Sequence, residues 1–166
     1  MKYPLIDRDH STLAFNERVL SWARRADVPV LERLRYLCIV SSNLDEFFEV
    51  RMALHLRAMQ DRHRHAGFTR QTYQAISKQA HELVSSQYEV YNDQLIPALA
   101  KAGIRIVSHA DRNVEQHRWV KRYFDQEVKP LLMPVSLDPS HPLPQVANKS
   151  LNFIVHLKGK DAFGRS

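Results

Sequence analysis

Residues 30–58 read VLERLRYLCIVSSNLDEFFEVRMALHLRA, and this stretch predicts the longest helix of the chain. When it is projected at about 100° per residue, its large apolar side chains fall on one stripe and most of its charged side chains fall on the opposite side. A helix with this division buries one face against other helices. The stripe consists of Leu37, Val40, Leu44, Phe47 and Leu54.

The side-chain amide of Asn43 lies within or beside this apolar stripe. A buried amide without partners costs roughly 1–3 kcal/mol, so something should bond to it. One explanation is a partner inside the bundle. The other is a ligand, because an amide both donates and accepts and so suits a nucleobase edge, with Phe47 one turn later as an apolar or stacking surface. Arg51, near the same stripe, is equally explained as a long side chain whose charge reaches solvent.

Two further amphipathic helices flank this one. Ser11 is a plausible N-cap for a helix that ends near Ala26, and Pro29 is suited to the first turn of the long helix. After a polar connector at 60–67, Thr69 is a plausible N-cap for a third helix. The apolar faces consist of Phe15, Val19, Trp22 and Ala26 in the first helix and of Tyr73, Ile76, Ala80, Leu83, Val90 and Leu95 in the third.

The third helix should kink or restart at Pro97 and stop at Gly103. Residues 1–103 are therefore predicted to form an N-terminal three-helix bundle. The pattern changes afterwards, and residues 104–166 are predicted to begin an incomplete α/β (α+β) domain, so the chain as a whole is mainly α.

The second domain is predicted to contain short strands and one helix. Asn113 and Gln116 resemble a capping pair for a helix to about Val128, which would bury Val120 and Phe124. The strand candidates are 104–107 and 151–157, a proline-rich loop is expected at 138–144, and Gly159 and Gly164 mark a final turn.

The composition indicates which partners the protein can bind and which cellular compartment it suits. With 24 Lys and Arg against 18 Asp and Glu, the net charge of +6 favours polyanionic partners such as nucleotides, nucleic acid or polyphosphate. Cys38 is the single cysteine, and residues 1–11 lack the apolar core of a secretory signal. No apolar run reaches the ~20 residues of a membrane span. We therefore expect a soluble, cytoplasmic protein.

Catalytic and metal-binding motifs are not evident in the sequence. His63 and His65 lie in a charged connector without a cysteine pair or an HExxH pattern, so no metal site is predicted. With four glycines there is no glycine-rich phosphate loop, and Cys38 is interpreted as a small core residue. Three carboxylates at 45, 46 and 49 share a face that is commonly solvated. No catalytic residue is assigned.

Three separated motifs resemble one known family. They are TLAFNERVL at 12–20, VLERLRYL at 30–37 followed by SSNLDEFF at 41–48 and Val50-Arg51, and HPLP at 141–144 followed by Asn148 and SLNF at 150–153. Together they are similar to the N-terminal part of bacterial polyphosphate kinase of the first type. Thr12 stands where the family commonly has Trp, and Pro97 interrupts a helix that need not contain proline.

The resemblance implies an enzyme that reversibly transfers the terminal phosphoryl group of ATP to polyphosphate, with magnesium and a phosphohistidine intermediate. In that family the N-terminal helical domain forms one wall of the adenine pocket, and its adenine-contacting asparagine matches Asn43. A head domain contributes to dimerisation, which implies a homo-oligomer. Two C-terminal domains carry the catalytic histidine and the phosphate-binding residues, so this chain alone is expected to be inactive.

Two other interpretations remain open. The first is a non-enzymatic basic helical module that binds nucleic acid or a protein partner, for which steep salt dependence of polynucleotide binding without a response to ATP would be diagnostic. The second is a structural adaptor in which Asn43 bonds only within the bundle. The family resemblance makes nucleic acid the less favoured partner.

Overall fold

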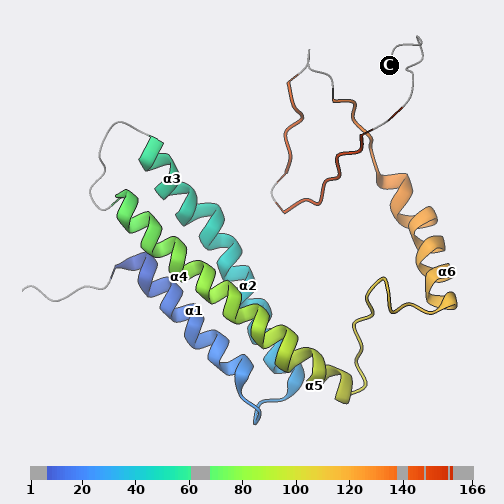
Figure 1. The fold of residues 1–166 in the computed structure, drawn as a ribbon, viewed down its shortest axis with the longest axis horizontal. Coiled ribbons are helices and arrows are strands. Elements are labelled where there is room, and N and C mark those ends of the chain that lie inside the picture. The colour runs from blue at the N-terminus through green and yellow to red at the C-terminus, as the bar shows by residue number, and fades with distance from the viewer. Residues whose placement is uncertain (1–6, 61–67, 138–141, 148, 157, 159–166) are drawn as a thin grey trace, which may run out of the picture. The chain divides into compact units, whose positions relative to one another are not determined.

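A computed structural model describes residues 7–60, 68–137, 142–147, 149–156 and 158 of the chain. The chain divides into two compact units, residues 1–108 and 109–166. The first unit contains three long helical rods, which lie side by side in Figure 1. Its helices confirm the mainly helical fold that the sequence predicts.

The first rod is α1 (Arg8–Arg24). It begins earlier than predicted, because the carboxylate of Asp7, and not Ser11, caps it by accepting hydrogen bonds from the backbone N–H groups of Asp9 and His10 at 2.9 and 3.1 Å. The helix ends at Arg24, close to the predicted end. The earlier start places Asp9 in the first turn, where its side chain is buried.

The second rod consists of α2 (Val30–Glu46), the π-helical segment η1 (Phe47–Met52) and α3 (Ala53–Gln60), with right-handed helical backbone at each junction. Pro29 occupies the N-cap position. The long helix predicted over 30–58 is thus present, and the π-helical turn inside it was not predicted.

The third rod consists of α4 (Arg70–Glu89), the π-helical segment η2 (Val90–Leu95) and α5 (Ile96–Lys101). Thr69 caps it as predicted, since its hydroxyl accepts from the Thr72 N–H at 3.0 Å. Pro97 lies at the start of α5, where a new α-helical segment begins.

The third rod ends at Gly103, as predicted, in a Schellman motif. Gly103 has φ +82°, and its N–H donates to the Ala100 carbonyl at 3.1 Å, while the Ile104 N–H donates to the Leu99 carbonyl at 2.9 Å. This pair of hydrogen bonds satisfies carbonyls that the helix end leaves free.

The core of the first unit lies between the three rods. Spacing between buried positions in the α-helical parts is three or four residues, or seven between Leu83 and Val90, but it is five residues across each of η1 and η2. A π-helical turn adds one residue to an α-helix, so each segment shifts the buried face by one position. The buried apolar residues are Leu13, Leu20 and Ala23 of α1; Leu37, Val40, Leu44, Phe47 and Met52 of the second rod; and Ile76, Ala80, Leu83, Val90, Leu95 and Leu99 of the third.

Because of this shift, the prediction that Leu54 belongs to the buried stripe is wrong. Leu54 is 39% exposed, and Met52 and His55 are buried in its place. A uniform projection at 100° per residue continues the stripe without the extra residue and so chooses the wrong position beyond η1. Phe15 and Trp22 of α1 are likewise exposed, at 51% and 43%, although the sequence placed both on the apolar face.

The second unit contains α6 (Val114–Tyr123), the π-helical segment η3 (Phe124–Val128) and the short 3₁₀-helix η4 (Lys129–Leu131). The predicted capping pair is confirmed: the Asn113 side chain accepts from the Gln116 N–H, and the Gln116 side chain accepts from the Asn113 N–H, both at 2.9 Å. The prediction that Phe124 is buried is wrong, because its side chain is 43% exposed, and Val120 is half-buried.

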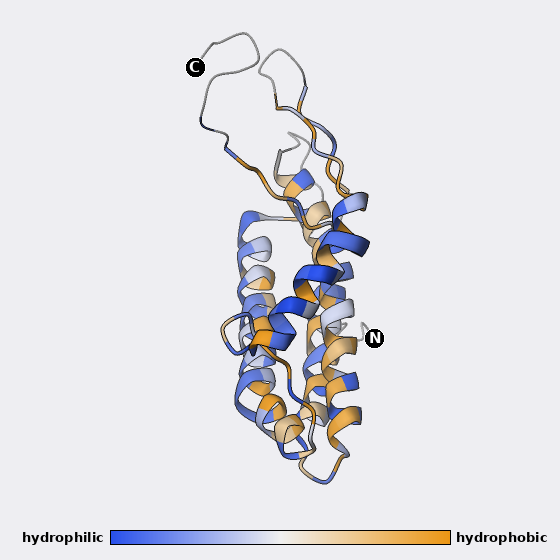
Figure 2. Ribbon diagram, turned by 90° about the vertical axis from the view of Figure 1, so that its right-hand side faces the viewer, coloured by the Kyte–Doolittle hydropathy of each residue, from blue (hydrophilic) through white to orange (hydrophobic). Residues whose placement is uncertain are grey.

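No described residue of the second unit is buried, and none of the described residues of the chain forms a strand. Residues 104–107 and 151–156 have no ladder partner among the described segments, so the predicted α/β domain stays a prediction. Figure 2 shows orange, hydrophobic stretches along the segments that follow α6. The most exposed apolar side chains there are Leu131, Met133, Leu143, Leu151, Phe153 and Ile154, at 78–87%.

Some predicted features lie outside the described residues. They are most of the connector at 60–67 with His63 and His65, part of the loop at 138–144, the motif residues His141 and Asn148, and the turn marked by Gly159 and Gly164. Within the described segments, none of the helices combines the length and the apolar character that crossing a bilayer requires.

Candidate functional site

Asn43 lies half-buried on α2 and faces α1. Its Nδ2 donates to Oδ1 of Asn16 at 2.7 Å, and the Asn16 Nδ2 donates to the backbone carbonyl of Thr12 at 3.0 Å. Asn16 is only 1% exposed. The amide that the sequence selected therefore has a partner inside the bundle, as one of its two explanations required.

The pairing leaves part of Asn43 available. Its amide has two N–H groups and a carbonyl oxygen, and one N–H is used by Asn16. No described residue donates a hydrogen bond to the Asn43 Oδ1. A half-buried side chain with an unused acceptor and an unused donor can bind a polar edge presented from outside the bundle, so the ligand explanation also stays compatible with this geometry.

Phe47 does not provide the stacking surface suggested by the sequence. Its side chain is 2% exposed and lies in the core, because it continues the buried face of α2. Its edge-on neighbour Phe48 is half-buried, with ring centroids 6.1 Å apart, and Phe48 in turn meets the ring of His81 on α4 at 5.9 Å. The aromatic side chains near Asn43 thus pack rods against each other.

A buried ionic cluster joins the start of α1 to the second rod. Arg51 donates from Nε to Oδ1 of Asp9 at 2.5 Å and from Nη2 to Oδ2 at 3.1 Å, and His55 Nε2 lies 2.9 Å from the same Oδ2. Asp9 is 3% exposed. Arg51 is therefore not simply a side chain reaching solvent, since it forms a two-bond ion pair with a buried carboxylate.

The charges in this cluster determine the ionisation of Asp9. Burial acts to raise the pKa of Asp9, but hydrogen bonds from Arg51 and His55 and the charge of Arg51 outweigh it, so the pKa lies below its usual value. The hydrogen bond to Asp9 correspondingly raises the pKa of Arg51. His55 contacts Phe68 with ring centroids 4.7 Å apart, and its buried Nδ1 has no hydrogen-bond partner among the described residues.

The opposite end of α1 is held by Arg33. Its Nε donates to the Ala23 carbonyl at 2.7 Å, and its Nη2 lies 3.3 Å from Oε1 of Gln94 on η2. Among the described residues, three positions of the first rod are thus joined to the second rod by polar bridges. We name these bridges Asp9–Arg51, in which His55 also takes part, Asn16–Asn43 and Ala23–Arg33.

The π-helical turn in η1 accounts for the spacing of two of these bridges, Asp9–Arg51 and Asn16–Asn43. The α1 residues lie seven positions apart, which is close to two helical turns. On the second rod, Asn43 and Arg51 are eight positions apart because η1 contributes one extra residue. If the same residues formed an uninterrupted α-helix, Arg51 would be rotated away from Asp9.

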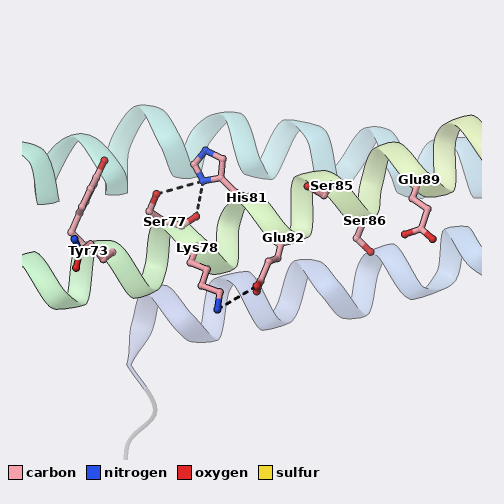
Figure 3. Close-up of a pocket in the computed structure, with 9 residues that line it drawn as sticks. Tyr73, Ser77, Lys78, His81, Glu82, Ser85, Ser86 and Glu89 are labelled. Atoms are coloured by element: carbon pink, nitrogen blue, oxygen red, sulfur yellow. Dashed lines mark hydrogen bonds and ion pairs between the residues drawn. The ribbon is translucent and has the colours of Figure 1, made fainter.

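A surface depression lies along α4, and Asn43 is not among its lining residues. Figure 3 shows its labelled side chains, all of which come from this one rod. His81 Nδ1 lies 2.7 Å from the Ser77 carbonyl, and Lys78 forms a 3.8 Å ion pair with Glu82. Because a single helix lines it, the depression is an open surface and does not enclose a ligand.

The described residues offer no metal cluster at Asn43. Among the described residues, no group of three or more histidine, cysteine or acidic side chains is placed to hold a metal ion. The carboxylates of Asp45, Glu46 and Glu49 are exposed, and Cys38 is exposed as well, not in the core as predicted. The chemistry that this site offers is hydrogen bonding by an oriented amide.

Two family models match the chain. The model described as the polyphosphate kinase N-terminal domain covers residues 5–107, and the one described as the polyphosphate kinase middle domain covers residues 115–166.

Individual relatives show the same similarity. A polyphosphate kinase of Neisseria meningitidis serogroup B is 48% identical over 165 residues, 97% of this chain and 24% of the relative, and one of Burkholderia cenocepacia is 47% identical over 169 residues, 99% and 25%. A crystal structure of polyphosphate kinase from Porphyromonas gingivalis matches with a TM-score of 0.73 and 35% identity over 89% of this chain and 21% of that one. The chain spans about a quarter of the length of the curated relatives it matches.

Proposed function

The chain belongs to the polyphosphate kinase family, and from this premise we propose that it forms the nucleotide-contacting N-terminal portion of an enzyme that reversibly transfers the terminal phosphoryl group of ATP to polyphosphate. In this proposal Asn43 contacts adenine. The observation that carries it is the half-buried Asn43 amide, whose acceptor receives no hydrogen bond from a described residue although it lies within an apolar helix face.

The hydrogen-bonding capacity of Asn43 supports adenine as the ligand. Adenine presents its 6-amino donor beside ring-nitrogen acceptors, and an asparagine amide can match such a donor–acceptor pair with two hydrogen bonds. Asn43 contributes binding and orientation in this role. It has no part in transferring the phosphoryl group.

We assign the transfer step itself to other parts of the enzyme. The family resemblance implies magnesium and a phosphohistidine, and the two matched models carry the names of the N-terminal and middle domains. Phosphoryl transfer requires a positioned nucleophile, metal ions and a charge clamp, and we propose that other domains of the enzyme supply all three. The chain alone should then make no polyphosphate from ATP and magnesium.

We also propose that the second unit contributes to a dimer interface in the cytoplasmic enzyme. Support comes from the family resemblance and from the exposed apolar side chains between Leu131 and Ile154, which need a protein surface to cover them. The net charge of +6 is compatible with polyphosphate as the second substrate.

Kinetics of Asn43→Ala in the complete enzyme test the adenine contact. Loss of a neutral hydrogen bond costs roughly 0.5–1.5 kcal/mol, so KM for ATP should rise about 2- to 12-fold while kcat changes little. Ser42→Ala, at the neighbouring exposed position, is the matched control. An Asn43→Ala variant that folds normally and has an unchanged ATP dependence would show that Asn43 serves only the bundle.

The basic-module alternative predicts a different result. The chain would then bind polynucleotides with an affinity that falls steeply as salt increases, and ATP would have no effect. Titration of a labelled oligonucleotide at two salt concentrations, with and without ATP, distinguishes the two functions.

A further inference from the structure

The hydrogen bonds around Asn43 fix which way its amide points. Backbone carbonyls can only accept, so the Asn16 group that lies 3.0 Å from the Thr12 carbonyl must be the donating Nδ2. The Asn16 Oδ1 is then the atom that faces Asn43, and it requires a donor there. Asn43 must therefore direct Nδ2 toward Asn16, at 2.7 Å, and keep its Oδ1 for another partner.

Reversing the Asn43 amide is unfavourable because two oxygens would then face each other. Turning only Asn43 would bring its Oδ1 against the Asn16 Oδ1 at the observed 2.7 Å. Turning both amides would instead place the Asn16 Oδ1 against the Thr12 carbonyl at 3.0 Å. Asn16 is 1% exposed, so solvent does not compensate either arrangement.

We propose that Asn16 is a positioning residue that sets the base selectivity of the enzyme by fixing the polarity of the Asn43 amide. This inference rests on the proposed adenine contact. Adenine offers a 6-amino donor next to an N1 acceptor, whereas hypoxanthine, held in the same pose, offers a 6-oxo acceptor next to an N1–H donor. An amide of fixed polarity matches the first pattern and opposes the second.

Steady-state kinetics of the complete enzyme with ATP and with ITP, the hypoxanthine nucleotide, test this inference. The wild-type enzyme should prefer ATP in kcat/KM. In Asn16→Leu the acceptor is lost and the Asn43 amide can turn, so the ATP-to-ITP ratio should fall by about tenfold. A merely structural role for Asn16 would lower both rates together and leave the ratio unchanged.

Three further variants make the test specific. Asn16→Asp keeps an oxygen that accepts from Asn43, and its carboxyl in the neutral form donates to the Thr12 carbonyl as the amide does, so this variant should retain the wild-type ratio. Asn16→Ala also removes the acceptor, and it replaces Asn16→Leu in the kinetic test if the leucine variant folds poorly. Ile76→Val, a core change on α4, should lower the melting temperature without changing the ratio.

The outcomes separate this inference from the proposed function. If Asn43→Ala raises KM for ATP but neither Asn16→Leu nor Asn16→Ala changes the ratio, the positioning role is wrong and the adenine contact stands. If the wild-type enzyme does not distinguish ATP from ITP, the fixed amide does not act in selectivity. If Asn43→Ala leaves KM unchanged, both fail.

Discussion

Asp9 is a buried carboxylate whose ionisation links the stability of the bundle to pH. Its folded-state pKa lies below the usual value of 3.8 because Arg51 and His55 stabilise the charged form more than burial destabilises it. Between the folded and unfolded pKa values the unfolded chain binds more protons, so stability rises with pH in that window. The contribution is present above pH 3.8 and is lost as pH falls through the folded pKa.

We predict that Asp9→Asn lowers the free energy of unfolding by about 2 kcal/mol at pH 5, since it breaks a charged pair that is largely buried. The difference from wild type should shrink as pH falls below 3.8, because the carboxylate of the unfolded wild-type chain then binds a proton more readily than the folded one does. Urea unfolding at pH 5 and pH 3 measures it.

Asp27→Asn provides the matched control for this prediction. Asp27 pairs with Arg25 on the surface, where solvent screens the interaction, so its loss should have a smaller effect. A difference between wild type and Asp9→Asn that is equal at pH 5 and pH 3 would contradict the assigned ionisation.

Single residues were predictable from sequence to different degrees. Asn43 could be singled out because an amide within an apolar stripe is unusual whatever its partner is. Asp9 could not, because only the packing of α1 on the second rod reveals that it is buried opposite Arg51. Its seven-residue spacing from Asn16 was a signal, yet it is meaningful only once α1 is known to begin at Arg8.

At the scale of elements, the helices themselves were largely predictable and the π-helical turns were not. Capping residues and apolar periodicity located the three rods and α6 to within a few residues. A π-helical turn uses the same kinds of residue as an α-helix, so composition does not reveal it. Its signal is a five-residue gap between apolar positions, visible at Phe47–Met52 and Val90–Leu95 after the buried face is known.

Because η1 contains one extra residue, we predict that two single-residue deletions have different effects on stability. Removing Val50, which is half exposed within η1, should convert the segment to an α-helix and keep Arg51 opposite Asp9, so stability should change little. Removing the exposed Ser42 from α2 should instead rotate one part of the helix by about 100° relative to the other. That deletion should cost about 3 kcal/mol or more, as apolar side chains leave the core.

Thermal melts of the two deletion variants measure the contrast. Equal loss of stability in both would mean that η1 does not act as an inserted residue in an α-helical rod. Circular dichroism at low temperature checks that each variant remains helical before the melts are compared.

At the scale of the whole molecule, all buried residues of the described chain lie between Asp9 and Leu99. The domain boundary predicted at Gly103 stays a prediction, and this distribution supports it. The α/β character of residues 104–166 could not be established from their own sequence, because a strand forms only when another strand pairs with it.

We predict that residues 1–103 fold cooperatively when expressed alone, because they contain every buried side chain of the described residues and the left-handed Gly103 at which the third rod ends. Residues 104–166 alone should aggregate, since Phe153, Ile154 and their apolar neighbours are exposed. Circular dichroism and melting of both pieces decide this. An unfolded 1–103 piece or a stable, monomeric 104–166 piece would place the boundary elsewhere.

The three polar bridges have a consequence for the order in which the bundle folds. They join residues 10, 27 and 42 positions apart along the chain, for Arg33, Asn43 and Arg51 respectively. The entropic cost of closing a loop increases with this separation. Pairing of the first two rods should therefore begin at the turn before Pro29 and advance toward the start of α1. Kinetic φ-values from truncation of these side chains should therefore decrease from Arg33 to Arg51, and the reverse gradient would mean that the chain closes from its distant end first.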